Sequence, residues 1–186
     1  VDQHLGGETR VLAALADVLP GLSRVTAYSR RLETAEAFAA AARHVRFEAK
    51  AVDDPRGAIE GADVVVSSVS IGGLVQPFVD AAWLAPGAFV AAVDLARAWH
   101  PAGFHHFDVV ATDEGQQSQQ LIEKGRMPFA WTFDADLSDF AQSQASFRGS
   151  PSQRTLFVFA GHALADLAVA GFVYDHARKR DADGSP

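Results

Sequence analysis

Apolar and polar positions in the first third of the chain alternate between two spacings. Residues 12–19 (LAALADVL) repeat apolar side chains at helical spacing, and Pro20 and Gly21 follow where a helix is expected to end. Residues 24–29 (RVTAYS) form a short run rich in β-branched and aromatic side chains, which predicts a strand. Residues 33–44 consist almost wholly of good helix formers. The pattern therefore predicts a helix, a strand and a second helix.

Short apolar runs continue the alternation further along the chain. Residues 63–69 (DVVVSSV) form a continuous β-branched run, which is typical of a strand buried on both faces of a parallel sheet. Weaker or similar runs predict strands at residues 47–52, 88–94 and 107–113, with short helical segments between them. A long apolar stretch at residues 156–177 predicts a closing helix, and residues 179–186 are predicted to form a disordered tail.

This order predicts an α/β fold of the Rossmann-like, doubly wound type, with one mostly parallel sheet and helices on both faces. We assign residues 1–178 to this single domain. The strand that normally opens such a fold is not found, because residues 1–15 (VDQHLGGETRVLAAL) supply only a turn at Gly6 and Gly7 and a helix. That strand would occupy the middle of the sheet, where an empty place leaves backbone groups unpaired. We therefore expect further residues ahead of Val1, or another segment that fills the place; the lack of an initiator Met agrees with this.

Composition excludes several classes of protein. The net charge of −7 and the scattered arginines argue against binding to nucleic acid. The chain has no cysteine, which excludes disulfides and thiolate–metal sites and agrees with a reducing compartment. No apolar run reaches the roughly 20 residues of a membrane span, so we predict a cytoplasmic protein with no membrane partner. The spacing of His100, His105 and His106 lacks helical ligand geometry, and no metal site is predicted.

Candidate binding residues follow the predicted strands, because parallel sheets bind ligands at the carboxyl ends of their strands. Ser29, Arg30 and Arg31 follow the first of these strands. An acidic residue at this place commonly bonds the ribose 2′-hydroxyl of NAD, whereas arginine pairs with a 2′-phosphate through charge-assisted bonds. The sequence therefore predicts NADP, with NAD as the alternative cofactor. The other interpretation is a solvated pair of arginines ahead of a helix.

Small polar residues end the strand at residues 63–69. Small side chains at this place permit a ribose and a nicotinamide to approach, although serines also simply end strands. We predict cofactor contacts here from Ser67, Ser68, Val69 and Ser70. Gly6 and Gly7 are the candidates for a phosphate-binding turn, but no G-x-G-x-x-G pattern is present, and a plain loop is the alternative.

Asp94 is the candidate catalytic residue. A carboxylate at the carboxyl end of a strand, beside a nicotinamide, can act as a general base or stabilise a developing iminium charge. The alternative is that Asp94 caps the turn that follows.

Four segments carry a family resemblance. They are LPGLSRVTAYSRRLETAEAFA, GADVVVSSVS, WLAPGAFVAAVD and RTLFVFAGHALADLAVAGFVYDHA. Together they resemble the cofactor domain of the ornithine cyclodeaminase and mu-crystallin family, over almost the whole chain. The most specific parts are W-L-x-P-G-A ahead of a strand and the late T-L-F-x(3)-G-x-A-x-x-D-L-A-V-A segment. The run DLARAWHP is similar to family members described as a component of tyramine oxidase.

The resemblance implies an NAD(P)(H)-dependent enzyme that acts on a small amine, amino acid or imino acid. It also implies a homodimer whose subunits pair this domain with a preceding substrate and dimerisation domain, which this chain lacks. It places His162 near the nicotinamide, with a satisfied core histidine as the alternative. The catalytic Asp of the family falls nearest to Asp94, although an ungapped alignment places it nearer Ala96. The glycine-rich loop falls around residues 3–8, where the expected glycines do not match.

Two functional hypotheses remain open. The first is the cofactor-binding domain of an NAD(P)(H)-dependent oxidoreductase or a cyclodeaminase-like enzyme, inactive as an isolated chain because it supplies one wall of an interdomain cleft. The second is a non-catalytic nucleotide-binding or regulatory subunit with a degenerate glycine loop.

Overall fold

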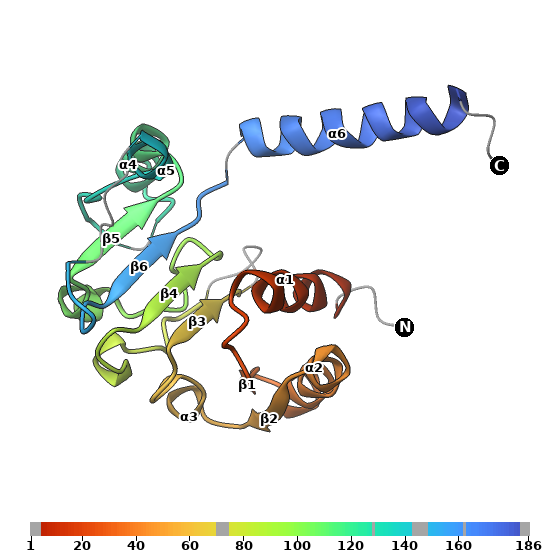
Figure 1. The fold of residues 1–186 in the computed structure, drawn as a ribbon. Coiled ribbons are helices and arrows are strands. Elements are labelled where there is room, and N and C mark those ends of the chain that lie inside the picture. The colour runs from red at the N-terminus through yellow and green to blue at the C-terminus, as the bar shows by residue number, and fades with distance from the viewer. Residues whose placement is uncertain (1–4, 70–74, 128, 143–148, 162, 183–186) are drawn as a thin grey trace.

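The computed structural model describes residues 5–69, 75–127, 129–142, 149–161 and 163–182 (Figure 1). The helices are α1 (Leu5–Val18), α2 (Leu32–Val45), α3 (Pro55–Ile59), α4 (Gly115–Glu123), α5 (Leu137–Gln142) and α6 (Ala163–Ala182), with 3-10 helices η1 (Ala81–Trp83) and η2 (Pro101–His106). The strands are β1 (Arg24–Tyr28), β2 (Glu48–Val52), β3 (Val64–Ser67), β4 (Phe89–Ala92), β5 (Val109–Thr112) and β6 (Thr155–Val158).

All of these strands run parallel, in two separate sheets. One sheet pairs β1 with β2, and the other has the order β3-β4-β6-β5. This confirms the predicted parallel α/β class. The expected single sheet is divided between β1 and β3, and the described residues contain no strand at that place (Figure 1).

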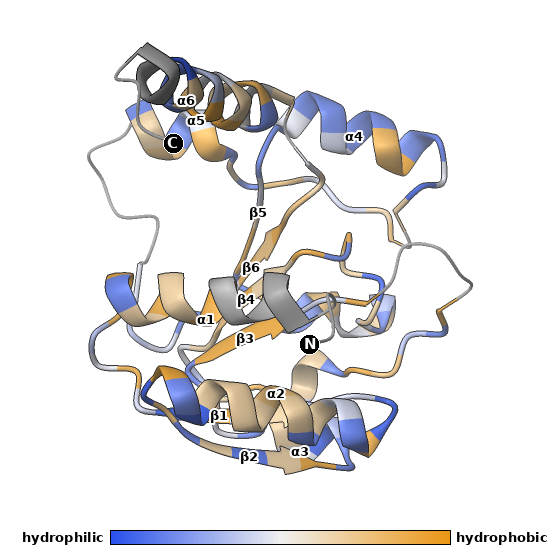
Figure 2. Ribbon diagram, turned by 90° about the vertical axis from the view of Figure 1, so that its right-hand side faces the viewer, coloured by the Kyte–Doolittle hydropathy of each residue, from blue (hydrophilic) through white to orange (hydrophobic). Residues whose placement is uncertain are grey.

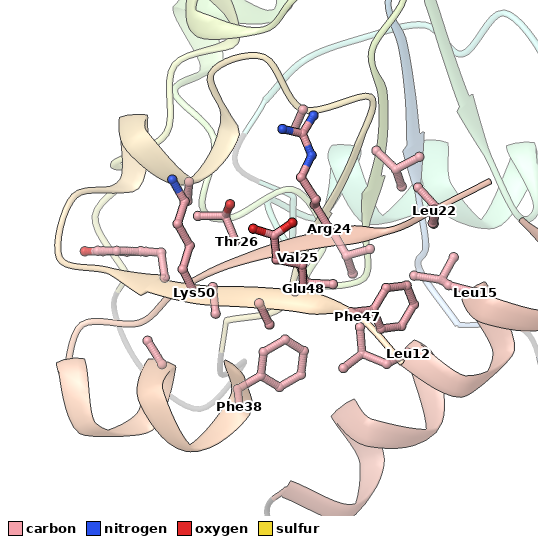
Figure 3. A pocket seen from close by; sticks show the side chains of 18 of the residues that line it. Leu12, Leu15, Leu22, Arg24, Val25, Thr26, Phe38, Phe47, Glu48 and Lys50 are labelled. Atoms are coloured by element: carbon pink, nitrogen blue, oxygen red, sulfur yellow. The ribbon is translucent and has the colours of Figure 1, made fainter. Parts of the chain in front are cut away.

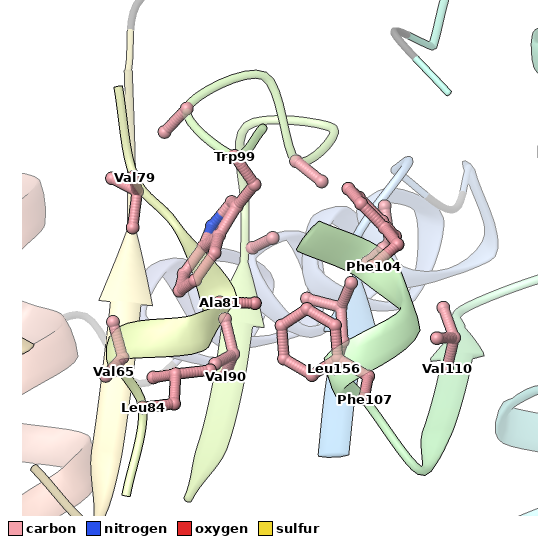
Figure 4. Close-up of a cluster of buried hydrophobic side chains, with 14 of the residues drawn as sticks. Val65, Val79, Ala81, Leu84, Val90, Trp99, Phe104, Phe107, Val110 and Leu156 are labelled. Carbon is pink, nitrogen blue, oxygen red and sulfur yellow. The ribbon is translucent and has the colours of Figure 1, made fainter. Parts of the chain in front are cut away.

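The main core covers one face of the four-stranded sheet. Val65, Val90 and Leu156 project from three neighbouring strands toward the two 3-10 helices, where Phe104 is 1% exposed (Figure 4). Trp99 and Phe107 meet edge to face in the same cluster, with ring centroids 5.8 Å apart. Only this face of the strands is buried. Val66 of β3 is 40% exposed and Phe89 of β4 is 36% exposed on the other face, so the prediction that residues 63–69 form a strand buried on both faces is wrong.

A smaller core belongs to the two-stranded sheet. The alanines Ala35, Ala39 and Ala42 of α2 are at most 2% exposed, because the helix lies against β1 and β2. Leu12 of α1 packs with Ala42 and Phe47 in one small cluster, and Ala35 and Ala39 pack with Ala27 of β1 in a second one. The run of good helix formers therefore forms the predicted helix, and its small side chains let it lie close to the sheet.

The closing helix predicted at residues 156–177 is wrong in its first part. Residues 155–158 form β6, which lies between β4 and β5, with Leu156 opposite both Val90 and Val110. Gly161 has φ 97°, a left-handed conformation that ends the strand segment before α6 begins. The run TLFV is short and rich in β-branched and aromatic residues, which favour a strand. Its packing between two neighbouring strands stabilises this conformation over a helix. α6 then continues to Ala182, past the predicted start of the tail.

The glycine of the W-L-x-P-G-A segment is required by its backbone. Gly87 has φ 83°, and a Cβ at this position would collide with the carbonyl oxygen of Pro151. The Gly87 N–H donates to the carbonyl oxygen of Ser152 at 2.8 Å. The close approach joins the start of β4 to the segment that leads into β6.

The helix α6 projects away from the sheets (Figure 1). Leu167, Phe172 and Tyr174 on it are each more than 60% exposed. Among the helices of the described residues, none has the length and hydropathy needed to cross a membrane. Figure 2 shows the mixed hydropathy of the other surface helices.

Candidate functional site

A cavity of about 1000 Å³ opens between β1 and β3 (Figure 3). Its walls come from the whole of β1, from alternate residues of β3, and from helices α1, α2 and α3. Its apolar lining residues include Leu12, Leu15, Val25, Phe38, Phe47, Val64 and Val66. The division between the sheets is therefore a groove rather than a packed interface.

Two of the predicted cofactor residues meet in this cavity. Ser29 follows β1 and Ser68 follows β3, and both line the same space from opposite sheets. Tyr28 at the end of β1 also lines it and contacts Phe78, with ring centroids 5.8 Å apart. The carboxyl ends of β1 and β3 therefore border one opening, as expected from parallel strands.

The predicted arginines lie at the edge of this opening. Arg30 and Arg31 follow Ser29 directly, and both are exposed. Arg31 is the N-cap residue of α2, although its side chain makes no capping hydrogen bond. Neither arginine is a lining residue of the cavity. Both side chains are therefore exposed to solvent at the carboxyl end of β1, where the sequence predicts that an anion of the ligand binds.

Asp94 lies just beyond β4 and is 1% exposed. Its Oδ1 accepts a hydrogen bond from the Ser67 hydroxyl at 3.1 Å, and its Oδ2 accepts from the Val69 N–H at 3.3 Å. The Trp99 Nε1–H donates to the same Ser67 oxygen at 3.0 Å. A chain of hydrogen bonds therefore runs from Trp99 through Ser67 to Asp94, and Ser67 and Val69 meet Asp94 rather than the cavity.

Burial dominates the electrostatics of Asp94. Loss of solvent raises the pKa of its carboxyl above the ordinary value of 3.8, while the bonds from Ser67 and Val69 act in the opposite direction. The turn after it is strained, since Leu95 has φ 59° and Ala96 has φ 55°. This left-handed pair reverses the chain directly after the carboxylate.

A second buried carboxylate, Asp113, was not among the predicted site residues. It follows β5, is 3% exposed, and accepts from the N–H groups of Ala160 at 3.2 Å and Gly161 at 2.7 Å. It also accepts from the Glu114 N–H at 3.1 Å. Its position directly after a predicted strand was the available signal. Asp113 holds the segment after β6, ahead of α6.

Other predicted residues do not join the cavity. Gly6 and Gly7 lie in the first turn of α1 rather than in a separate turn ahead of it, and their role in binding phosphate stays a prediction. Ser70 and His162 lie outside the described residues. His105 bonds the Ala102 carbonyl oxygen through Nδ1 at 2.6 Å. The described part of the chain contains no group of three or more metal-ligating side chains.

The parallel strand order, and the strand ends that border one opening, define the Rossmann-like class of α/β proteins. The chain belongs to the ornithine cyclodeaminase/mu-crystallin family, whose sequence profile matches residues 7–181. A comparison with curated proteins found no match.

Solved structures agree with this assignment. A Δ1-pyrroline-2-carboxylate reductase from Thermococcus litoralis, in complex with NADH and L-proline, is 19% identical with a TM-score of 0.76, and the match covers 94% of this chain and 56% of that one. An archaeal alanine dehydrogenase dimer with bound NAD is 22% identical with a TM-score of 0.75, covering 92% and 54%. A lysine cyclodeaminase, described for its recognition of L-lysine, L-ornithine and L-2,4-diaminobutyric acid, is 23% identical with a TM-score of 0.71, covering 94% and 51%.

These likenesses establish the fold. The chain spans just over half the length of each of these relatives.

Proposed function

We propose that the chain is the cofactor-binding domain of an NAD(P)(H)-dependent oxidoreductase or cyclodeaminase-like enzyme that acts on a small amino acid, imino acid or amine. The observation that carries this proposal is the shared opening at the carboxyl ends of β1 and β3, lined by Ser29 and Ser68. Membership of the family and the names of the three structural relatives support the substrate class.

The residues at this opening fit a dinucleotide. Ser29 and Ser68 have small side chains that leave room for a ribose, and their hydroxyls can both donate and accept hydrogen bonds. Arg30 and Arg31 supply the positive charge that an adenosine 2′-phosphate requires, which favours NADP over NAD. The cofactor supplies the acceptor or donor of a hydride, and these residues bind and orient it.

Asp94 is the proposed acid–base residue of the reaction. Its raised pKa keeps the carboxyl protonated to a higher pH than a solvated aspartate, which suits a group that both donates and accepts a proton. The Ser67 hydroxyl donates a hydrogen bond to its Oδ1, and the Trp99 Nε1–H in turn donates to that hydroxyl oxygen.

One observation favours the second candidate, a non-catalytic nucleotide-binding or regulatory subunit. The Asp94 carboxylate is 1% exposed and is satisfied by Ser67 and Val69, so it meets neither solvent nor the cavity. The lack of a G-x-G-x-x-G pattern around Gly6 and Gly7 agrees with this candidate.

The remaining parts of the proposal concern the whole protein. This chain matches 56% and 54% of two solved relatives, and we propose that a separate domain supplies the substrate-binding residues and the homodimer interface. The proposed location is the cytoplasm. An isolated chain is expected to bind the cofactor but not to turn over substrate, because it provides one wall of the active site.

Titration of the chain with NADPH and with NADH, followed by nicotinamide fluorescence, tests the cofactor assignment. We expect NADPH to bind about ten- to hundredfold more tightly, since hydrogen bonds to a charged group contribute about 1.5–3 kcal/mol. The double substitution Arg30→Ala and Arg31→Ala should remove this preference and leave NADH binding nearly unchanged.

The matched control is Arg56→Ala. Arg56 is an exposed arginine of α3 that pairs with Glu60 at 3.1 Å, and its removal should leave the preference intact. Equal affinity of the unmodified chain for both cofactors would remove the role of Arg30 and Arg31. Failure to bind either cofactor would argue against the proposed domain as a whole.

A further inference from the structure

The Ser67 hydroxyl lies between two buried side chains, Trp99 and Asp94, each of which is 1% exposed. The Trp99 Nε1–H donates to the Ser67 Oγ at 3.0 Å, and the Ser67 O–H donates to the Asp94 Oδ1 at 3.1 Å. Every buried side-chain nitrogen and oxygen of the described residues has a hydrogen-bond partner. These three side chains therefore form a satisfied chain of hydrogen bonds at the end of β3.

The donor and acceptor capacities of the three groups determine the direction of the bonds. An indole N–H can only donate, whereas a serine hydroxyl has one hydrogen and two acceptor lone pairs. Because Trp99 donates to the Ser67 oxygen, one of the places around that oxygen is closed to the hydrogen of the hydroxyl itself. If a protonated Oδ1 of Asp94 were to donate to Ser67 instead, the Ser67 hydrogen would need another acceptor.

We propose that Trp99 is a positioning residue for Asp94: it fixes the Ser67 hydroxyl as a donor to Oδ1 in both protonation states, so that Oδ2 carries the exchangeable proton. Ser67 keeps its own proton throughout, and the only bond made or broken in the exchange is the O–H bond at Oδ2. The catalytic meaning of this arrangement rests on the acid–base role proposed above for Asp94, whereas the arrangement itself can be tested without cofactor or substrate.

The surroundings of Oδ2 suit an oxygen that exchanges a proton. Oδ2 accepts from the Val69 N–H at 3.3 Å, a longer bond than the one at Oδ1. Val69 follows Ser68, which lines the groove, and Val93, directly before Asp94, lines it as well. Oδ2 is thus bonded to a segment that borders the groove, whereas Oδ1 is connected through Ser67 to the core.

Packing in the core fixes the position of the Trp99 indole. Trp99 belongs to the same cluster as Val65 and Val90, and its ring meets Phe107 edge to face with centroids 5.8 Å apart (Figure 4). The Trp99 backbone N–H donates to the Ala96 carbonyl oxygen at 3.1 Å, in the turn that follows Asp94. The indole N–H is therefore held against Ser67 by contacts that do not depend on the charge of Asp94.

The electrostatics of Asp94 give the sign of the expected effect. Burial raises its pKa, while the Ser67 hydroxyl and the backbone N–H groups of Val69, Asp94 and Ala96, all neutral, act in the opposite direction. A hydroxyl that is fixed as a donor favours the ionised carboxylate. Without the indole N–H, the hydroxyl is free to turn and accept from the protonated carboxyl, so the pKa of Asp94 should rise.

A titration of Asp94 by carboxyl ¹³C NMR, with labelled aspartate and no cofactor, tests the proposal. The Asp94→Asn variant identifies the signal by its loss. Trp99→Phe keeps an aromatic ring in the core but removes the N–H, and we expect Asp94 to bind its proton roughly two- to tenfold more tightly, as the loss of one hydrogen bond predicts. Ser67→Thr keeps the hydroxyl and should preserve the behaviour of the unmodified chain.

A double variant separates the proposed role from simple packing. In the Ser67→Ala background the connection to Asp94 is already broken, so Trp99→Phe should have no further effect on the titration. The matched control is Trp83→Phe, because Trp83 packs against the same core but takes no part in this chain of hydrogen bonds. An equal effect of Trp99→Phe with and without the Ser67 hydroxyl would overturn the proposal, as would an unchanged titration of Asp94 in Trp99→Phe.

The indole N–H signal of Trp99 provides a second measurement if Ser67→Ala does not fold. In the unmodified chain this signal should shift with pH at the same midpoint as the Asp94 carboxyl, because Ser67 joins the two groups. A Trp99 signal that is insensitive to this titration would count decisively against the proposal, even where the chain binds NADPH. Failure to bind either nicotinamide cofactor, with the coupling intact, would instead contradict the proposed function and leave the arrangement of hydrogen bonds standing.

Discussion

Buried carboxylates link neighbouring strand ends of the larger sheet. Asp94, after β4, accepts hydrogen bonds from Ser67 and Val69 at the end of β3. Asp113, after β5, accepts from Ala160 and Gly161 beyond β6. In both cases the carboxylate satisfies donors that the ladder of the sheet leaves free where a strand ends. The carboxyl edge of this sheet is therefore ordered by side chains as well as by the ladder.

The substitution Asp94→Asn should change how stability depends on pH. Burial raises the pKa of Asp94 in the native state, so its contribution to stability is fully present below the ordinary value of 3.8 and is lost as pH rises through the native pKa. The difference in unfolding free energy between the unmodified chain and this variant should therefore shrink as pH rises. Urea unfolding at several values between about pH 3 and pH 7 measures this difference.

The matched control is Asp136→Asn, for which the sign is reversed. The hydrogen bond from the Ser138 hydroxyl lowers the pKa of Asp136, so its contribution is present above 3.8 and is lost as pH falls through the native pKa. The difference for this variant should grow as pH rises. Parallel trends for the two variants would contradict the assignment of burial as the dominant effect at Asp94.

At the scale of elements, β6 and α6 are both apolar in sequence but differ in conformation and burial, because their neighbours in the fold differ. Both belong to one continuous apolar stretch, yet Leu156 of β6 is 0% exposed and Leu167 of α6 is 67% exposed. Leu156 packs between β4 and β5, where its neighbours exclude water. α6 has apolar side chains exposed along its length, which is unusual for a helix at the surface of a protein.

Leucine truncations in these two elements should therefore have very different effects. Leu156→Ala is expected to lower the unfolding free energy by about 2–5 kcal/mol, because it leaves a cavity in the core. Leu167→Ala should change it by less than about 0.5 kcal/mol, because the side chain is already solvated. Urea unfolding of both variants provides the comparison, and similar losses would show that α6 is packed in solution.

At the scale of the whole molecule, the division of the sheet produces two units of unequal size. The unit around β1, β2, α1 and α2 has two small cores, whereas the unit around β3 to β6 has one large one. The described contacts between the units include the helix α3 and the pair Tyr28 and Phe78. Among the described residues, no strand of the smaller unit pairs with a strand of the larger one.

The smaller unit should open at a lower free energy than the larger unit. Native-state hydrogen exchange at increasing, sub-denaturing urea concentrations should show the amides of β1 and β2 exchanging through a partial opening. The free energy of this opening should be roughly 1–3 kcal/mol lower than that for the amides of β4 and β6. The Tyr28→Ala variant, which removes the ring contact with Phe78, should widen this gap. A single common opening free energy for all six strands would contradict it.

Local patterns in the chain predicted most of the elements. The strand at residues 24–29 and the helix at residues 33–44 have nearly the bounds of β1 and α2. Ser29 and Ser68 were predicted as site residues from their places after strands, and the structure brings them to one cavity. The inward orientation of Asp94 could not be predicted in this way, because it depends on Ser67 and Val69, more than twenty residues away along the chain.

The sequence by itself determined the parallel α/β class, the order of most elements and the strand ends where small polar residues gather, because these depend on hydrophobic periodicity and on turn residues that act locally. Only the tertiary structure decided that residues 155–158 form a central strand, that Asp94 is turned into the core, and that the sheet is divided by a groove. Those features depend on which strands lie next to one another, and neighbours in a parallel sheet are brought together by long crossovers that no local pattern specifies.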